Sequence, residues 1–322
     1  MKNTKISCVI VTYNRLTLLQ ECLKAVLSQT FPLYRIIIID NCSTDKTSFF
    51  LKSYENDPQF IIKRTEKNIG GAGGFSLGIK EAILDGADYV WIMDDDTIPH
   101  HNALDELAKV AYISDNVGFA CSKVNWIDGN IHPRNKPGGI SKNHVEILYN
   151  NNIKAYNCEV CTFVSVLINS KTVYRIGLPI KEFIIWSDDI EYTLRITKAN
   201  YNNYYVESSV VIHKTPDIFN PTIEDAPINM ANRFYYQTRN QCYIKHRTQS
   251  NKLLFRLSIW NKLRILKQRI KRRKDGVFEP FLEAVKKGCK DGLTFFPEIE
   301  YLQTDNDINI KGKENNVTTK RV

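Results

Sequence analysis

Two kinds of apolar pattern alternate along the first 125 residues of the chain. Short runs of β-branched residues predict buried strands, and apolar residues at every third or fourth position predict helices. The predicted strands are residues 6–14, 34–41, 60–65 and 88–96, and the predicted helices are residues 16–30, 43–54 and 74–86. Alternating strand and helix units of this kind are typical of an α/β fold, in which helices cover both faces of a parallel sheet.

Polar residues follow all four predicted strands. They are residues 12–15, Asp40 with Asn41, residues 68–74 and residues 94–96. Ligands of open parallel sheets bind beyond the carboxyl ends of the strands, so these residues are predicted to line one crevice. The first turn has no G-x-G-x-x-G and the chain has no G-x-x-x-x-G-K-[ST], which argues against a dinucleotide site and a P-loop.

The stretch "NIGGAGGFSLG" in this crevice is rich in glycine. Glycine allows positive φ and close approach of a ligand to the backbone. Phe75 is predicted to open a helix whose free N–H groups favour negative charge. A flexible turn would have the same composition.

Three adjacent carboxylates end the fourth predicted strand. Alternate residues of a strand point to the same side, so Asp94 and Asp96 are predicted to face one point while Asp95 faces elsewhere. Two carboxylates held so close repel each other unless a proton or a cation lies between them. Mg²⁺ or Mn²⁺ bridging a diphosphate would suit this place. The alternative is structural: Asp96 or Thr97 caps a helix over residues 101–113.

The second half of the chain has further acidic residues. In "FIIWSDDIEYTLRITKAN", Asp188, Asp189 and Glu191 begin a predicted helix, where the helix dipole favours acids. One of these carboxylates could instead be a general base. Cys158 and Cys161 form a C-x-x-C without a second pair downstream, so a core role is predicted for them rather than a metal site.

The net charge of +9 comes from one segment. Residues 252–274 contain ten Lys or Arg and no acid, which leaves 34 basic against 35 acidic residues elsewhere. A predicted apolar stripe on this helix consists of Leu253, Leu257, Trp260, Leu263, Leu266 and Ile270. Such a helix suits an anionic membrane surface; packing on its own domain is the alternative, and nucleic acid is not expected because no nucleic-acid module accompanies it.

Five motifs in this order resemble those of glycosyltransferase family 2. They are "ISCVIVTYNR", "IIIIDNCSTD", "NIGGAGGF", "WIMDDDTIP" and "WSDDIEYTLR". The resemblance implies an inverting nucleotide-sugar transferase with a GT-A fold, which is a Rossmann-like, mostly parallel sheet flanked by helices. The glycine-rich stretch before the aspartates looks most like the galactofuranosyltransferase branch of this family, with rhamnosyltransferases close to it.

The resemblance also implies roles for individual residues. Nucleotide-sugar binding is expected at Thr12, Tyr13, Asn14, Arg15, Asp40, Asn41, Asn68, Gly70, Gly71, Asp94 and Asp95. Asp94, Asp96 and His213 are expected to bind Mn²⁺ or Mg²⁺. Asp189, or else Asp188, is expected to be the catalytic base, with Trp186 and Glu191 contacting the acceptor.

The expected organisation has three parts. Residues 1–245 form the GT-A domain, with a nucleotide-sugar half at 1–125 and an acceptor and base half at 126–245; residues 246–300 form a basic amphipathic helical extension and residues 301–322 a disordered tail.

The expected reaction transfers galactofuranose from UDP-galactofuranose to a lipid-linked glycan of a bacterial surface polysaccharide, or rhamnose from dTDP-rhamnose. No apolar run spans a bilayer and no signal peptide is expected, so the enzyme would lie in the cytoplasm against the inner face of the plasma membrane. The alternatives from other classes are a non-catalytic membrane-binding module and a nucleotidyltransferase.

Overall fold

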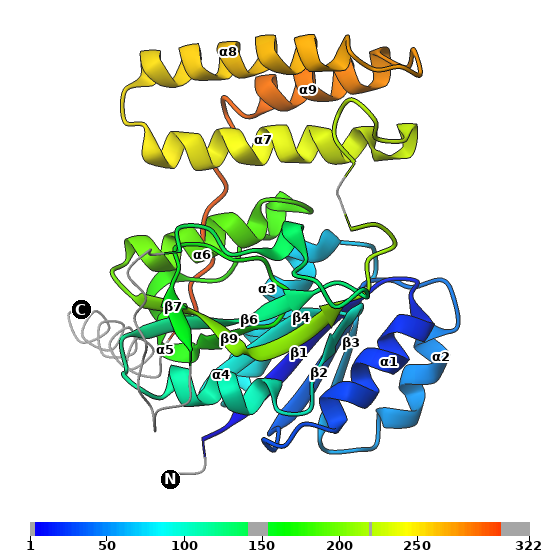
Figure 1. Cartoon of the computed structure of the whole chain (residues 1–322), viewed down its shortest axis with the longest axis vertical. Helices are drawn as coiled ribbons and strands as arrows, with labels where there is room; N and C mark the ends of the chain where they lie inside the picture. The colour runs from blue at the N-terminus through cyan, green and yellow to red at the C-terminus, as the bar shows by residue number, and fades with distance from the viewer. Residues whose placement is uncertain (1–3, 141–153, 219–220, 304–322) are drawn as a thin grey trace, which may run out of the picture.

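The computed structural model describes residues 4–140, 154–218 and 221–303, which form an α/β body and a layer of three helices beside it (Figure 1). The predicted tail lies outside the described residues from residue 304 onward. The layer stands on one side of the body, and the chain passes into it at α7 and back from it after α9.

One nine-stranded sheet forms the centre of the body. Its strands are β1 (Ile6–Thr12), β2 (Arg35–Asp40), β3 (Phe60–Arg64), β4 (Tyr89–Asp94), β5 (Thr97–Pro99), β6 (Val117–Asn125), β7 (Ala155–Asn157), β8 (Val166–Asn169) and β9 (Asn202–His213). The order is β3-β2-β1-β4-β8-β6-β9-β5, and β7 also pairs with β9. The first four strands pair in parallel as predicted, whereas β8 is antiparallel to both β4 and β6. The predicted α/β GT-A class is confirmed, with mixed pairing in its second half.

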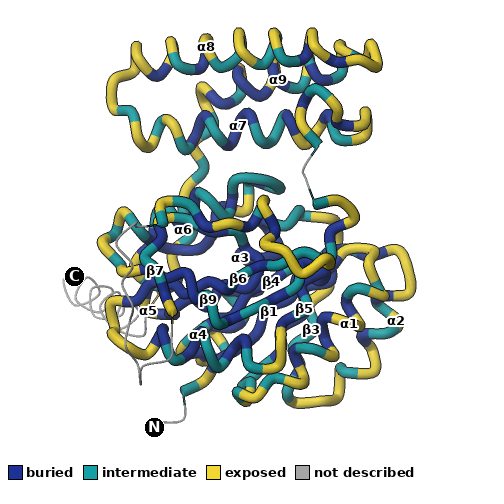
Figure 2. Tube along the Cα trace, in the orientation of Figure 1, coloured by how far each residue is buried: buried dark blue, intermediate teal, exposed yellow. Residues whose placement is uncertain are grey.

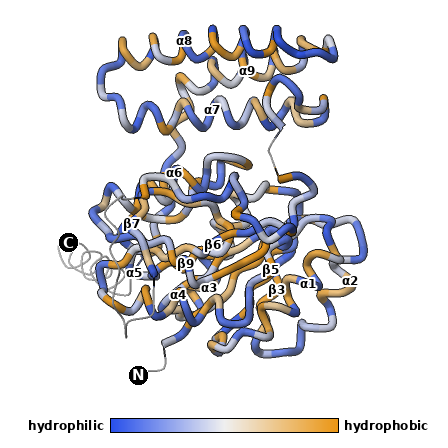
Figure 3. The backbone as a smooth tube through the Cα atoms, in the orientation of Figure 1, coloured by the Kyte–Doolittle hydropathy of each residue, from blue (hydrophilic) through white to orange (hydrophobic). Residues whose placement is uncertain are grey.

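Helices cover both faces of this sheet. They are α1 (Leu16–Leu27), α2 (Thr47–Leu51), α3 (Gly70–Leu84), α4 (Ala103–Ala111), α5 (Ser170–Ile176) and α6 (Asp188–Lys198). In β2, Ile36 and Ile38 join the apolar cluster that contains residues of α1 and α4, while Ile37 and Ile39 join the one that contains residues of α3 and α6. Because both faces are buried, the strand is continuously apolar (Figures 2 and 3).

The helix predicted to open at Phe75 begins earlier, at Gly70. Most of the glycine-rich stretch is therefore the first turns of α3 rather than a loop. A Cβ at Gly74 would lie 2.6 Å from Cγ1 of Val11, and one at Gly78 would lie 2.2 Å from Cγ1 of Val9. These glycines let α3 lie directly against β1, which is a packing role that the composition of the stretch did not indicate.

All eight cysteines lie in the described residues and carry free thiols, and seven of them are buried. Cys158 and Cys161 pack in the apolar cluster on the α3 side of the sheet. This agrees with the core role predicted for the C-x-x-C.

The helical layer consists of α7 (Ala231–Thr248), α8 (Lys252–Ile270) and α9 (Glu279–Asp291). The predicted boundary at residue 245 falls inside α7, so the layer begins earlier than predicted, at Ala231.

The predicted apolar stripe of α8 does not lie on one face. Phe255, Ile259 and Ile270 are the buried residues of this helix, whereas Leu253, Leu257 and Trp260 are 66%, 52% and 65% exposed. The hydrophobic residues of α8 are therefore divided between a face that packs on the layer and a face turned to solvent.

Candidate active site

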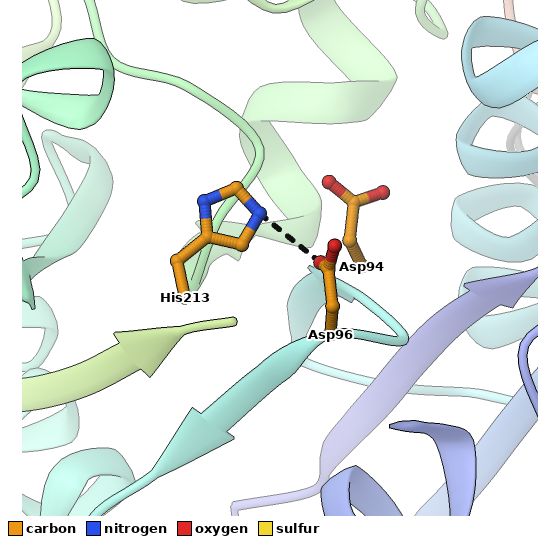
Figure 4. A group of neighbouring side chains, drawn as sticks. All are labelled: Asp94, Asp96 and His213. Atoms are coloured by element: carbon orange, nitrogen blue, oxygen red, sulfur yellow. Dashed lines mark ion pairs between the residues drawn. The ribbon is translucent and has the colours of Figure 1, made fainter. Parts of the chain in front are cut away.

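The three predicted metal ligands lie together where β4 and β9 end (Figure 4). Asp94 ends β4, Asp96 lies in the turn before β5 and His213 ends β9. One ligand atom of each lies within 4.8 Å of the others. The antiparallel pairing of β5 with β9 places Thr97 opposite His213, which brings the turn to the histidine. The common direction of Asp94 and Asp96 therefore comes from a turn and not from strand alternation.

His213 is held by a residue that the sequence analysis did not identify. Its Nδ1 lies 2.9 Å from Oδ1 of Asn135, in the 3₁₀ helix Pro133–Asn135, and its Nε2 lies 3.0 Å from Oδ1 of Asp96. An amide oxygen at Nδ1 accepts a hydrogen from it, which leaves the Nε2 lone pair for a metal. Asn135 is 78 residues from His213, so no local pattern pointed to it.

Asp95 points away from this cluster, as predicted. Thr12 Oγ1 donates a hydrogen bond of 2.7 Å to its Oδ2, and Arg15 Nη1 lies 3.3 Å from its Oδ1. The same Arg15 nitrogen lies 2.7 Å from Oδ2 of Asp96. Burial raises the pKa of Asp95 to about 6, against the opposing effect of Arg15. These contacts join the end of β1 to the end of β4.

The remaining two carboxylates differ in electrostatic environment. Burial and the neighbouring Asp96 and Asp95 raise the pKa of Asp94 well above its usual value. Burial also opposes ionisation of Asp96, but His213 and Arg15 outweigh it and lower the pKa of Asp96. Asp96 is therefore readily ionised, whereas ionisation of Asp94 is opposed by its surroundings. A cation between the two carboxylates would stabilise the ionised form of both.

The cluster fits a divalent cation by a further observation. Asp96 Oδ1 is buried and has no well-directed hydrogen bond within the described residues, although His213 is close. Two carboxylates and one imidazole are donors that Mn²⁺ and Mg²⁺ sites use. The capping alternative is wrong, since Asn102 rather than Asp96 or Thr97 precedes α4.

Asp40 and Asn41, at the end of β2, are almost fully buried. Asp40 accepts hydrogen bonds from Ser43 N at 2.8 Å and Ser48 Oγ at 2.8 Å, and Arg64 Nη1 lies 2.5 Å from its Oδ2. Asn41 accepts a hydrogen bond from Ile69 N and donates one to the Gly70 carbonyl. The polar groups of both residues are thus engaged within the protein. Asp40 joins the end of β2 to residues 43–48 and to the end of β3, and Asn41 joins it to the start of α3.

Residues 13 and 14 present a different picture. Asn14 has a positive φ of 55° and its Oδ1 accepts a hydrogen bond from Thr44 N at 2.6 Å. Tyr13 is 42% exposed. Among the residues expected at the nucleotide, Tyr13 therefore has an aromatic face open to a ligand.

Asn68, Gly70 and Gly71 lie at the start of α3. Asn68 Oδ1 accepts a hydrogen bond of 2.8 Å from Gly70 N. Gly70 has φ +76°, and a Cβ there would lie 2.1 Å from the carbonyl oxygen of Ile184, whereas one at Gly71 would meet nothing within 4 Å. Gly70 is required for contact with the segment that precedes α6, and Gly71 faces open space.

The segment before α6 has an unusual backbone. Ile184, Trp186 and Ser187 all have positive φ, between 64° and 70°. Such values cost about 1–3 kcal/mol each in residues other than glycine and tend to occur at functional sites. We call residues 183–187 the base loop, because it leads directly into Asp188 and Asp189.

Both predicted base residues, Asp188 and Asp189, have a raised pKa. Burial and the charge of Asp189 raise the pKa of Asp188 to about 8. Burial raises the pKa of Asp189 to about 6, against a hydrogen bond of 2.7 Å from Ile190 N to Asp189 Oδ1. The Asp188 charge also contributes, as a smaller effect, to the raised pKa of Asp94.

The two residues expected at the acceptor lie differently. The Trp186 ring meets Phe234 edge to face at 5.5 Å, and the Arg233 guanidinium lies 5.9 Å from its centre. Glu191 instead forms a bidentate ion pair with Arg195, at 3.1 and 2.9 Å. It lines a cavity of about 620 Å³ between α5, α6 and the end of α7, which none of the three metal-cluster residues lines. The predicted acceptor contact of Glu191 has no support in this geometry.

The motifs and this geometry agree with a comparison of the sequence with known families. A family described as "Glycosyl transferase family 2" matches residues 7–177, which is more than half of the chain. The chain belongs to glycosyl transferase family 2. The resemblance is confirmed, and with it the prediction that the protein is a glycosyltransferase.

Relatives in this family match parts of the chain. The galactofuranosyltransferase GlfT1 of Mycolicibacterium smegmatis is 36% identical over 100 residues, which are 31% of this chain and 32% of GlfT1. The glycosyltransferase AglE of Haloferax volcanii is 26% identical over 214 residues, which are 65% of this chain and 66% of AglE. The chain thus spans about a third of GlfT1 and just under two thirds of AglE.

Solved structures share the fold. GalNAc-T7, solved with UDP, GalNAc and Mn²⁺, superposes with a TM-score of 0.56 at 16% identity over 75% of this chain and 51% of its own. Residues 1–349 of S. aureus TarS, solved with UDP, superpose with a TM-score of 0.51 at 14% identity over 90% of each chain. At these identities the likeness bears on the fold alone.

Proposed function

We propose that this protein is an inverting, metal-dependent glycosyltransferase that moves a sugar from a nucleoside diphosphate to an acceptor hydroxyl. The observation that carries the proposal is the convergence of Asp94, Asp96 and His213 at the strand ends. Mn²⁺ or Mg²⁺ bound by these three residues would stabilise the negative charge that develops on the leaving diphosphate. The imidazole ligand favours Mn²⁺.

The base in this proposal is Asp189, with Asp188 as the alternative. A carboxylate whose pKa is raised to about 6 is largely ionised at neutral pH and still accepts a proton well. It takes the proton of the acceptor hydroxyl as the hydroxyl oxygen bonds to the anomeric carbon and the bond to the diphosphate breaks. A single displacement of this kind inverts the anomeric centre.

The donor is held at the carboxyl ends of β1, β2 and β4. The exposed ring of Tyr13 is placed against the nucleobase of the donor. Arg15 lies beside the metal cluster and has a side chain that is 45% exposed, which suits contact with a phosphate. The donor site in this proposal also includes Thr12, Asn14, Asp40, Asn41 and Asp95 at these strand ends and Asn68, Gly70 and Gly71 at the start of α3.

The best candidate donor is UDP-galactofuranose, with dTDP-rhamnose as the alternative. The support is the likeness to GlfT1, which is named a galactofuranosyltransferase. TarS and GalNAc-T7 were both solved with UDP.

The proposed acceptor is a lipid-linked glycan of a bacterial surface polysaccharide, met at the inner face of the plasma membrane. No described helix has the length and hydropathy needed to cross a bilayer. Support comes from the outer face of α8, where Leu253, Leu257 and Trp260 are exposed on a helix that carries no acid. Exposed apolar residues among cations suit an anionic lipid surface.

The test is release of nucleoside diphosphate from a panel of UDP- and dTDP-sugars, with lipid extract as acceptor, with and without anionic vesicles. We expect turnover of one donor, loss of that turnover in EDTA and its return with Mn²⁺. Asp96→Ala should lower kcat at least about 1,000-fold, since it removes a ligand of the charge-stabilising cation. Vesicles should raise the rate if the membrane surface takes part.

The matched control is Asp115→Ala, because the exposed Asp115 pairs with Lys171 and lies just before the start of β6, which pairs with the start of β9, whereas His213 ends β9. It should leave kcat unchanged. If no donor is turned over by the folded protein, the non-catalytic binding module becomes the better interpretation. Release of pyrophosphate instead of nucleoside diphosphate would identify a nucleotidyltransferase.

A further inference from the structure

The base loop needs support from outside itself. Three of its residues have positive φ, and η3 (Lys181–Phe183), whose last residue is the first of the loop, is a single 3₁₀ turn. Conformations of this kind persist only where surrounding contacts hold them. The Ile184 carbonyl accepts a hydrogen bond of 3.1 Å from Ala72 N, which supports one side of the loop.

Asn240 of α7 supports the other side. Its side chain is fully buried, and its Nδ2 lies 3.0 Å from the Phe183 carbonyl oxygen, 3.2 Å from that of Ile185 and 2.9 Å from that of Trp186. The two hydrogens of one amide nitrogen are therefore shared among three carbonyls of the base loop. Among the described residues, Arg239 is the one other side chain that hydrogen-bonds to any of these three carbonyls, through a longer contact of 3.5 Å from its Nη2 to that of Phe183.

Arg239 fixes the orientation of this amide. Its Nε and Nη2 donate hydrogen bonds of 3.1 and 2.9 Å to Asn240 Oδ1, and its Nη2 also lies 2.5 Å from the Glu182 carbonyl. The guanidinium lies 3.8 Å from the centre of the Phe295 ring. No carboxylate of the described residues lies within ion-pair distance of Arg239. A buried arginine without an acid, stacked on an aromatic ring, acts here as a rigid set of donors to the backbone.

We propose that Asn240, oriented by Arg239, is a positioning residue for the catalytic base. By holding the carbonyls of the base loop, it sets the direction in which α6 begins and therefore where the carboxylates of Asp188 and Asp189 lie. This inference rests on the proposed function, because it assumes that one of these carboxylates is the base. It also gives the helical layer a part in catalysis without any contact with substrate.

The test variant is Asn240→Asp in the full-length protein. Aspartate keeps the size of the side chain and can pair with Arg239, but it has no N–H to donate to the three carbonyls. We expect kcat to fall about 100-fold, the loss typical of a misplaced catalytic group, with the donor KM changed less than about threefold. The acid limb of the kcat–pH profile should also shift, because the surroundings of the base change.

The matched control is Asn232→Asp, which makes the same change at an exposed position of the same helix and should change neither kcat nor the pH profile. Hydrogen exchange of residues 183–190 measures the loop directly and needs no turnover. Exchange there should be faster in Asn240→Asp than in the wild type or in Asn232→Asp.

Several results would overturn the proposal. Unchanged exchange would mean that Asn240 does not hold the loop, and faster exchange with unchanged kcat and pH profile would mean that the loop does not position the base. Arg239→Lys, which keeps the charge but loses the fork, should show the same changes to a smaller extent and replaces Asn240→Asp if that variant does not fold. Absence of wild-type turnover with every donor would refute the proposed function itself, and exchange would still report on the loop.

Discussion

The metal cluster and the base loop are held in place by different parts of the molecule. Asp94 and His213 end strands of the central sheet, and strand pairing determines the position of the turn with Asp96. The base loop has no such pairing and depends on Asn240, 54 to 57 residues away in the chain.

The metal cluster and the base loop therefore differ in how much of the fold must change before they are disturbed. The metal cluster is part of the cooperative core, so disturbing it without unfolding the sheet requires changing a ligand or its direct support. The base loop is strained backbone held by a few hydrogen bonds, so it can be disturbed while the fold remains. The two regions should therefore respond differently to conservative substitutions.

The largest effect is expected at the base. Asp189→Asn should lower kcat about 10²- to 10⁴-fold, since general base catalysis contributes that much, and Asp188→Asn should lower it less. The base must be ionised, so the wild-type kcat should rise with pH around 6 if Asp189 is the base, and around 8 if Asp188 is. A kcat–pH profile at saturating donor and metal measures this, and a larger loss in Asp188→Asn would exchange the two roles.

A smaller effect is expected beside the metal cluster. Asn135→Ala removes the hydrogen-bond acceptor of His213 Nδ1, so the affinity for Mn²⁺ should fall about 10- to 100-fold. The Mn²⁺ concentration that gives half of the maximal rate measures this loss, and saturating Mn²⁺ should restore most of kcat. Asn135→Asp keeps an acceptor and is the control. Equal affinities in all three proteins would contradict the support role of Asn135.

The smallest effect concerns stability, and its sign differs between the two regions. The pKa of Asp188 is raised in the folded state, so folding favours its protonated form. The contribution of this group to the free energy of unfolding is fully present below about pH 4 and is lost as the pH rises toward 8. Asp188→Asn should therefore raise the free energy of unfolding at pH 8 by at least about 1 kcal/mol, with little change at pH 4.

The folded-state pKa of Asp96 is lowered, so its ionised form contributes stability above its unfolded pKa, and this is lost on acidification. Asp96→Asn should therefore destabilise the metal-free protein at neutral pH. Thermal denaturation in EDTA at pH 4 and pH 8 measures the change in stability of each variant. A change of the same sign in Asp188→Asn and Asp96→Asn would remove the contrast between the regions.

Much of the body could be predicted because its pattern is local. The four consecutive isoleucines of β2 make both faces of this strand apolar, and this alone indicated a strand covered by helices on both sides. Asp94, Asp96 and His213 were predicted together from the resemblance to glycosyltransferase family 2, and the fold brings them together. Five short motifs in the same order along the chain likewise predicted the family.

The errors lie where contacts join distant parts of the chain. Residues 70–74, four glycines and one alanine, have a loop composition, yet they are the start of α3, where Gly70 lies close to Ile184 and Gly74 lies close to β1. Glu191 is a separate case: both of its oxygens pair with Arg195 one turn further along α6, and its contact with the acceptor stays a prediction. The apolar residues of α8 divide between two faces because α7 and α9 cover only one of them.

The sequence by itself determined most of the strands and helices of the first 125 residues, where the acidic residues gather and to which family the chain belongs. Periodicity and short motifs carry this information because they reflect burial and chemistry within a few residues. Only the tertiary structure decided which side chains support the site. Asn135 and Asn240 are ordinary polar residues in the sequence, and each acquires a role only when folding buries its amide against a partner more than 50 residues away.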